Sequence, residues 1–133
     1  KKLINLKNVS FYIPVAYNEL SDLLCSADLH ILFQKNNVVD TVMPSKILAM
    51  MASEKPSLIT GNIKSEVYSI IKESKSGEYF DSSEINKIIQ FVKQIKIDKN
   101  LADKYGKNAR KYVAKNFSKE EVLKNFKKAL LGL

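Results

Sequence analysis

Short, continuous apolar runs are the feature that most constrains the fold of this chain. Residues 29–33 and 56–60 form two such runs, Leu-His-Ile-Leu-Phe and Pro-Ser-Leu-Ile-Thr. A strand that is covered on both faces has this pattern, as in a parallel sheet. A third short strand is predicted at Gly77–Phe80, and a strand-like run at residues 8–13 ends at Pro14. The chain is therefore expected to contain a parallel sheet.

Segments with the apolar spacing of helices alternate with these strands. They are predicted at residues 17–27, 44–52 and 65–74, and the chain after residue 80 is predicted to be helical. This alternation predicts an α/β fold of three layers with a Rossmann-like parallel sheet. The chain has 133 residues, 45% of them hydrophobic and 27% charged, so residues 1–133 are expected to form one domain with its own core.

The C-terminal helices carry capping signals and apolar faces. Asp98 and Ser118 are predicted N-caps, and a capping-box variant runs from Asp81 to Glu84. The apolar stripe of the first of these helices is predicted to be its buried face: Ile85, Ile88, Ile89, Val92 and Ile95. The last helix is predicted to bury Val122, Phe126, Ala129 and Leu130.

Cysteine and histidine are too few for several classes of site. Cys25 is the only cysteine and His30 the only histidine, which excludes a disulfide framework and a metal centre built from several such residues. Both are predicted to be packed structural side chains, and Met43, Met50 and Met51 are predicted to fill the core. No apolar run approaches the roughly 18–20 residues of a membrane span, and no signal-peptide pattern opens the sequence. We therefore expect a cytoplasmic protein.

The charge is +8 and unevenly placed. From residue 87 onward there are 13 Lys or Arg and 4 Asp or Glu, whereas the first 86 residues hold 9 and 10. A basic C-terminal third suggests an anionic neighbour, which could be nucleic acid, an anionic lipid surface or a phosphorylated substrate. The alternative is a solvated lysine-rich face, because Arg110 is the only arginine and no aromatic residues interleave with the lysines as on a nucleic-acid surface.

The loop after the strand at residues 29–33 is the most informative candidate site. Parallel sheets bind ligands outside the carboxyl ends of their strands, so we examined the loops at residues 14–18, 34–43 and 61–65. The middle loop leads through Asp40, Thr41, Val42 and Met43 into a helix that starts Pro44-Ser45-Lys46. The free backbone N–H groups of the first turn, the Ser45 hydroxyl and the Lys46 ammonium predict a diphosphate site. The alternative is that Lys46 is only a solvated first-turn residue.

Several segments, in order, resemble the carboxy-terminal half of a family 4 glycosyltransferase of the GT-B fold. They are residues 15–20, 23–24, 27–30, 40–52 with 55–56, 65–67 with Gly77, and Gly106, Ala109, Arg110 and 116–118. The Pro-Ser-Lys version resembles the transferases of bacterial surface polysaccharides, such as those of colanic acid and fucosamine. The resemblance covers nearly the whole chain.

The resemblance implies a function that the residue patterns do not give by themselves. It implies the donor-binding part of a retaining, hexosyltransferase-type enzyme of bacterial O-antigen, capsule or exopolysaccharide biosynthesis. The donor would be a nucleotide sugar, most simply UDP-linked, with no metal or other cofactor and no nucleic-acid partner. The acceptor would be a lipid-linked glycan at the inner face of the cell membrane, with peripheral membrane contact.

The resemblance also assigns roles to matching residues. It implies that Pro44, Ser45 and Lys46 hold the diphosphate and that Asp40 contacts the donor sugar. Ala49 stands where a glutamate normally holds the ribose, so that contact departs from the family pattern. The base would lie near Pro14, Val15 and Tyr17, mostly along the backbone. Glu54 stands where a small residue usually accepts a left-handed conformation, at a cost of ~1 kcal/mol relative to glycine.

Two further expectations concern what the chain lacks and what else it could be. The resemblance implies that the acceptor domain, the first two strands and all catalytic residues lie outside this sequence, so the fragment alone would be inactive. Residues 8–13 would then lack a sheet neighbour, which predicts association with another chain or a rearranged sheet. The alternative function is a non-enzymatic basic module that binds nucleic acid through its C-terminal helices.

Overall fold

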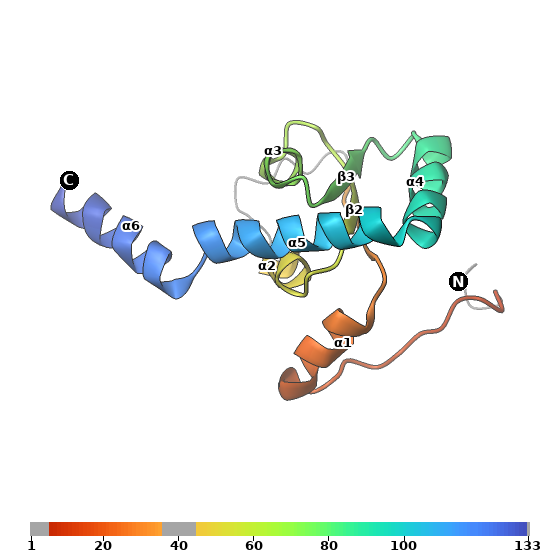
Figure 1. The fold of residues 1–133 in the computed structure, drawn as a ribbon, viewed down its shortest axis with the longest axis horizontal. Helices are drawn as coiled ribbons and strands as arrows, with labels where there is room; N and C mark the ends of the chain where they lie inside the picture. The colour runs from red at the N-terminus through yellow and green to blue at the C-terminus, as the bar shows by residue number, and fades with distance from the viewer. Residues whose placement is uncertain (1–5, 36–44, 133) are drawn as a thin grey trace.

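A computed structural model describes residues 6–35 and 45–132 and shows an α/β protein around a three-stranded parallel sheet (Figure 1). The strands are β1 (His30–Phe33), β2 (Ser57–Thr60) and β3 (Gly77–Phe80), in the order β1-β2-β3. The register aligns Leu32 with Ile59 and Ile59 with Tyr79. The predicted strands at residues 29–33, 56–60 and 77–80 are confirmed to within one residue, as is their parallel direction.

The helices also follow the prediction closely. They are a 3-10 turn at Tyr17–Glu19 that continues into α1 (Leu20–Ser26), then α2 (Ser45–Ala52), α3 (Glu66–Ser74), α4 (Ile85–Ile97), α5 (Lys99–Asn116) and α6 (Lys119–Leu131). Side-chain caps fix three of the helix starts. Ser65 accepts the Tyr68 amide at 3.2 Å, Asp98 the Leu101 amide at 2.9 Å and Ser118 the Glu121 amide at 3.3 Å.

The core has two parts, one on each face of the sheet. Helices α2 and α3 cover one face together with the C-terminal half of α5. The buried residues of this part are Ile47, Met51, Ile59, Val67, Ile70, Ile71, Tyr79 and Ala109. On the opposite face α4 and the first turns of α5 surround Leu58, Phe91 and Ile95. The predicted three-layer arrangement is thus present, and it is compatible with part of a Rossmann-like domain.

Helix α5 crosses the amino ends of the strands and joins the two parts of the core. Its Asn108 donates to the Lys75 carbonyl just before β3, and its Arg110 donates to the Ala52 carbonyl at the end of α2. A Cβ on Gly106 would lie 2.1 Å from the Glu54 carbonyl oxygen, so only glycine allows α5 to approach α2 this closely.

Two predictions about the strands are wrong. Residues 8–13 are not part of the sheet, because no strand of the described residues pairs with them. Strand β1 is not covered on both faces: among the described residues it is an edge strand, and Ile31 and Phe33 are 46% and 72% exposed. A continuous apolar run predicts that both faces of a strand are buried, but it does not show which other segments bury them.

Three side-chain predictions for the helices are also wrong. The predicted stripe of α4 is correct for Ile95, Ile88 and Val92, which are buried or packed against the core, but wrong for Ile85 and Ile89, which are exposed. Phe91, which was not predicted, is buried in their place. No residue of α6 is buried, and Val122, Phe126 and Leu130 are exposed. Cys25 is exposed as well, although its Sγ lies 3.9 Å from the Ser53 carbonyl oxygen. In each case the packing depends on neighbours that are far away in sequence. The spacing of apolar residues along one helix does not specify those neighbours.

Candidate functional site

The start of α2 lies at the carboxyl edge of the sheet. Because β1 and β2 are parallel, the crossover between them must return from the carboxyl end of β1 to the amino end of β2. Helix α2 makes this return, with Ile47 and Met51 packed against the sheet. Ser45 and Lys46 are exposed at its first turn. The first backbone N–H groups of a helix have no intrahelical acceptor, so this end can receive an anion.

A buried tyrosine organises the same edge. The Tyr79 hydroxyl on β3 donates toward the Asn62 carbonyl at 3.1 Å and lies 3.3 Å from Gln34 Oε1, which follows β1. It is also 3.0 Å from Ser65 Oγ, the N-cap of α3. These contacts connect the ends of all three strands, so the edge that faces the start of α2 is built on a rigid base.

The other end of α2 is held by a second polar cluster. Ser53 Oγ donates to the Met50 carbonyl at 2.7 Å and therefore accepts from Nε2 of His30 at 2.8 Å. Burial, and then the nearby Lys55 ammonium, lower the pKa of His30 below its ordinary value. The imidazole is thus a neutral structural donor, as the sequence predicted for a satisfied core histidine. Glu54 follows with a φ of 61°, the left-handed conformation expected at that position.

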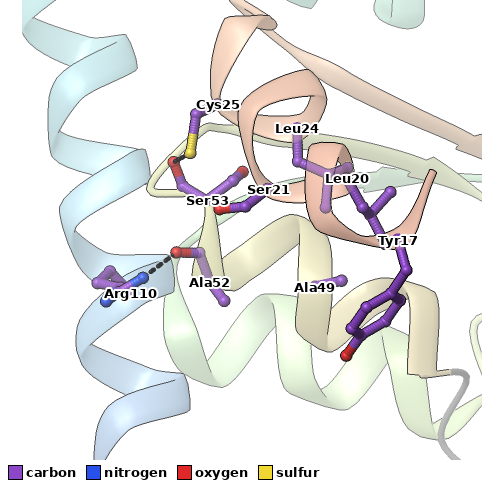
Figure 2. A pocket seen from close by; sticks show the side chains of 9 residues that line it. All are labelled: Tyr17, Leu20, Ser21, Leu24, Cys25, Ala49, Ala52, Ser53 and Arg110. Carbon is purple, nitrogen blue, oxygen red and sulfur yellow. Dashed lines mark hydrogen bonds between the residues drawn. The ribbon is translucent and has the colours of Figure 1, made fainter. Parts of the chain in front are cut away.

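An open cavity of about 320 Å³ lies between α1 and α2, and the side chain of Arg110 from α5 lines one end of it (Figure 2). Its nine lining residues are Tyr17, Leu20, Ser21, Leu24, Cys25, Ala49, Ala52, Ser53 and Arg110. In Figure 2 Tyr17 lies at the end nearest the beginning of α2, with Arg110 and Cys25 at the opposite end. The volume is near the lower limit of about 300–1,000 Å³ for small-molecule sites. None of the nine residues is acidic.

The structure brings only some of the predicted site residues together. Tyr17 and Ala49 line the same cavity although they are 32 positions apart in the sequence. Ser45 and Lys46 lie in the first turn of the same helix as Ala49. Pro14 and Val15 are exposed and do not line the cavity. The remaining predicted residues, Asp40, Thr41, Val42, Met43 and Pro44, lie outside the described residues.

Sequence reasoning missed several residues of the cavity wall. Ser53 and Arg110 were not predicted as site residues, and Leu24 was counted only as a helical apolar position. The helical period of residues 17–27 indicated an apolar face but not that α2 would meet it. Arg110 reaches the cavity because α5 crosses the amino ends of the strands, which no local pattern shows.

A second cavity, about 370 Å³, lies at the amino ends of the strands, where Gly77 begins β3. The Glu78 carboxylate in its wall already accepts two hydrogen bonds, from Lys72 Nζ at 3.3 Å and from the Tyr105 hydroxyl at 3.2 Å. Burial and Glu78 raise the pKa of Tyr105. This cavity is a less favourable candidate, because ligands of parallel sheets bind at the carboxyl ends of the strands.

Residues 6–35 and 45–132 offer neither a metal centre nor a membrane span. Within these ranges no three His, Cys, Asp or Glu side chains gather as they would around a metal ion. Nor does any helix there have the length and apolar character needed to cross a membrane.

The fold and the site define an α/β protein with a parallel sheet. At the carboxyl ends of the strands, the first turn of α2 is exposed to solvent. The chain is 25% identical over 122 residues to WcaI of Escherichia coli K12, which is provisionally described as a colanic acid biosynthesis glycosyl transferase. The match covers 91% of this chain and 29% of WcaI, so the chain spans less than a third of that relative. No family model and no solved structure matches the chain. The similarity supports a distant relationship to a glycosyltransferase.

Proposed function

We propose that this chain is the donor-binding part of a glycosyltransferase and binds the nucleotide of a nucleotide sugar. The observation that carries the proposal is the exposed first turn of α2, at the carboxyl edge of the sheet and on the same helix as the cavity residue Ala49. Its similarity to WcaI supports the same class of protein.

The diphosphate would bind at the start of α2. Backbone N–H groups of the first turn and the helix dipole favour negative charge there, and Lys46 adds a cation within the same turn. In the complete enzyme, these fixed dipoles would stabilise the charge that develops on the nucleotide diphosphate as it leaves. Asp40, in the preceding loop, would contact the donor sugar.

The nucleoside would lie in the cavity between α1 and α2. Tyr17 offers an aromatic face to the base, while Ala49 leaves room near the ribose but supplies no carboxylate. The ribose hydroxyls would therefore rely on groups such as Ser21 or on backbone atoms. Pro14 and Val15 would contact the base only if the segment before Tyr17 moves toward it.

The finer features of the enzyme are part of the same proposal. The donor is UDP-linked, the transfer proceeds with retention, and no metal is required. The product belongs to a bacterial surface polysaccharide, and the acceptor is a lipid-linked glycan that the enzyme meets at the membrane surface. Since the chain spans 29% of WcaI, transfer itself requires polypeptide beyond these residues.

Titration with UDP, followed by amide NMR, tests the proposal. We expect shifts at Ser45, Lys46 and Ile47, and a loss of roughly 10- to 150-fold in affinity in Lys46→Ala, because a charge-assisted contact is worth roughly 1.5–3 kcal/mol. Lys93→Ala removes an exposed lysine from α4 and serves as the matched control, with unchanged affinity.

Two results would contradict the proposal. One is the absence of UDP-dependent shifts in the first turn of α2. The other is salt-dependent binding of duplex DNA or RNA through α5 and α6 without any response to UDP, which would favour the basic nucleic-acid module.

A further inference from the structure

The second cavity, at the amino ends of the strands, has walls from three elements. The last turn of α3, the start of β3 and one face of α5 enclose about 370 Å³, which is within the range of about 300–1,000 Å³ for small-molecule sites. Because the three strands are parallel, this edge of the sheet is opposite to the edge at which α2 starts. The cavity is therefore separate from the proposed donor site.

Part of the cavity wall is apolar. Ile71 is fully buried, and Leu101 and Tyr105 are half-buried beside it. Leu101 and Tyr105 are four positions apart in α5, so they lie on the same face of that helix. The accessible parts of these two side chains can contact an aliphatic chain or an aromatic ring of a ligand.

Three lysines and one carboxylate also line the cavity. Lys72 is paired with Glu78 at 3.3 Å, and Glu78 accepts a second hydrogen bond from Tyr105. Lys75, which follows α3, and Lys104, which lies on α5, form no ion pair within the parts of the chain that the structure describes. Two ammonium groups from different elements can therefore receive an anion.

The backbone at Lys75 supports a role for its side chain. Its φ of 51° is left-handed, a conformation that is unfavourable for residues with a Cβ and that helix ends most often give to glycine. Asn108 Nδ2 donates to the Lys75 carbonyl at 3.0 Å and fixes this residue against α5. Strained residues that are held in place by their neighbours occur frequently at functional sites.

We propose that this cavity binds a small organic phosphate, in which a phosphate group is attached to an apolar ring or chain. A phosphate monoester has nearly two negative charges at neutral pH, and these match the ammonium groups of Lys75 and Lys104. The apolar part of the ligand lies against Leu101 and Tyr105. Glu78 does not oppose binding, because its charge is already compensated by Lys72.

Amide NMR with phenyl phosphate as the probe tests this inference. We expect saturable shifts at Gly77, Tyr105 and Asn108, with a dissociation constant on the order of 1 mM for so small a molecule. Inorganic phosphate has the charge without the ring, and phenol has the ring without the charge. Each should bind at least about fivefold more weakly than phenyl phosphate. All titrations use the Lys46→Ala chain, which lacks the cation of the proposed donor site.

Variants of the two free lysines identify the cations. Lys104→Gln and Lys75→Gly should each weaken the binding of phenyl phosphate by about threefold, and both together by about tenfold, because exposed ion pairs are individually weak. Lys107→Gln, at an exposed lysine of α5 outside the cavity, is the matched control and should leave the affinity unchanged. Lys75→Gly should not lower the urea midpoint, because glycine adopts the left-handed conformation without strain. Weaker binding by that variant is then not a loss of fold.

Three results would overturn the inference. The first is the absence of saturable shifts at Gly77, Tyr105 and Asn108. The second is binding of inorganic phosphate or phenol as tight as that of phenyl phosphate, which would mean that the charged and apolar parts of the wall do not act together. The third is equal weakening by Lys104→Gln and Lys107→Gln. These tests involve neither UDP nor the amides of the first turn of α2, so a failed UDP titration would leave this inference standing, and the converse also holds.

Discussion

At Glu54 a single backbone angle determines how α2 and α5 meet. Its φ of 61° turns the chain sharply after α2, and its carbonyl then faces Gly106 so closely that a Cβ there would be only 2.1 Å away. The left-handed conformation costs a residue with a Cβ roughly 1–2 kcal/mol, a cost that glycine does not have. The resemblance to the glycosyltransferase family implied this conformation, because a small residue usually stands at the position of Glu54.

Glu54→Gly is therefore expected to stabilise the chain. The expected gain is ~0.5–1 kcal/mol in the free energy of unfolding, because relief of the strained backbone outweighs the larger entropy of glycine in the unfolded state. Urea denaturation at neutral pH measures it. Lys55→Gly, one position later and without a positive φ, is the control and should give no gain. Equal stabilisation by both variants would show that the backbone angle is not the cause.

Helix α4 shows how an element can be predicted correctly and oriented incorrectly. Its bounds, Ile85–Ile97, agree with the predicted apolar stripe, but the buried positions are Phe91 and Ile95, with Ile88 and Val92 partly covered. Ile85 and Ile89 remain exposed because Phe91 contacts both Phe80 and Tyr105, with ring centroids 6.1 and 5.9 Å apart. These aromatic contacts, rather than the number of isoleucines, determine the rotation of the helix.

Truncation of Phe91 should accordingly cost far more stability than truncation of Ile89. We expect Phe91→Ala to lower the free energy of unfolding by roughly 3–5 kcal/mol, since it removes a buried ring from the centre of its cluster. Ile89→Ala, at a side chain 46% exposed, should cost under about 1 kcal/mol. Thermal unfolding followed by circular dichroism compares the two. Similar losses in both would mean that α4 does not bury Phe91 in preference to Ile89.

For the whole molecule, exposed apolar side chains concentrate at two places. One is the N-terminal segment with residues 11–13, and the other is α6 at the opposite end of the chain (Figure 1). The sheet core between them is well packed. The compact part of the described structure is thus the sheet with α2 to α5, and the two flanking regions contribute little to it.

Removal of α6 should therefore leave the core folded. We expect a chain that ends at Phe117 to lose less than about 1 kcal/mol of stability, because no residue of α6 is buried. Tyr112→Ala, on α5, should cost about 2 kcal/mol or more, since its ring packs against the main cluster. Urea denaturation of both variants measures the difference. Collapse of the fold on removal of α6 would show that its apolar face contributes to the core.

Apart from the strand predicted at residues 8–13, the sequence by itself determined the kind, order and approximate bounds of the strands and helices, and the caps at Asp98 and Ser118. These features depend on residue spacing and on contacts three or four positions apart, which are written locally in the chain. Only the tertiary structure decided which face of α4 is buried and that α6 buries none, that β1 lies at the edge of the sheet formed by the described residues, and that Tyr17 and Ala49 share a cavity. A side chain is buried by segments that are distant in the sequence. The spacing of residues within one helix therefore shows that a face is apolar, but not which segment packs against it.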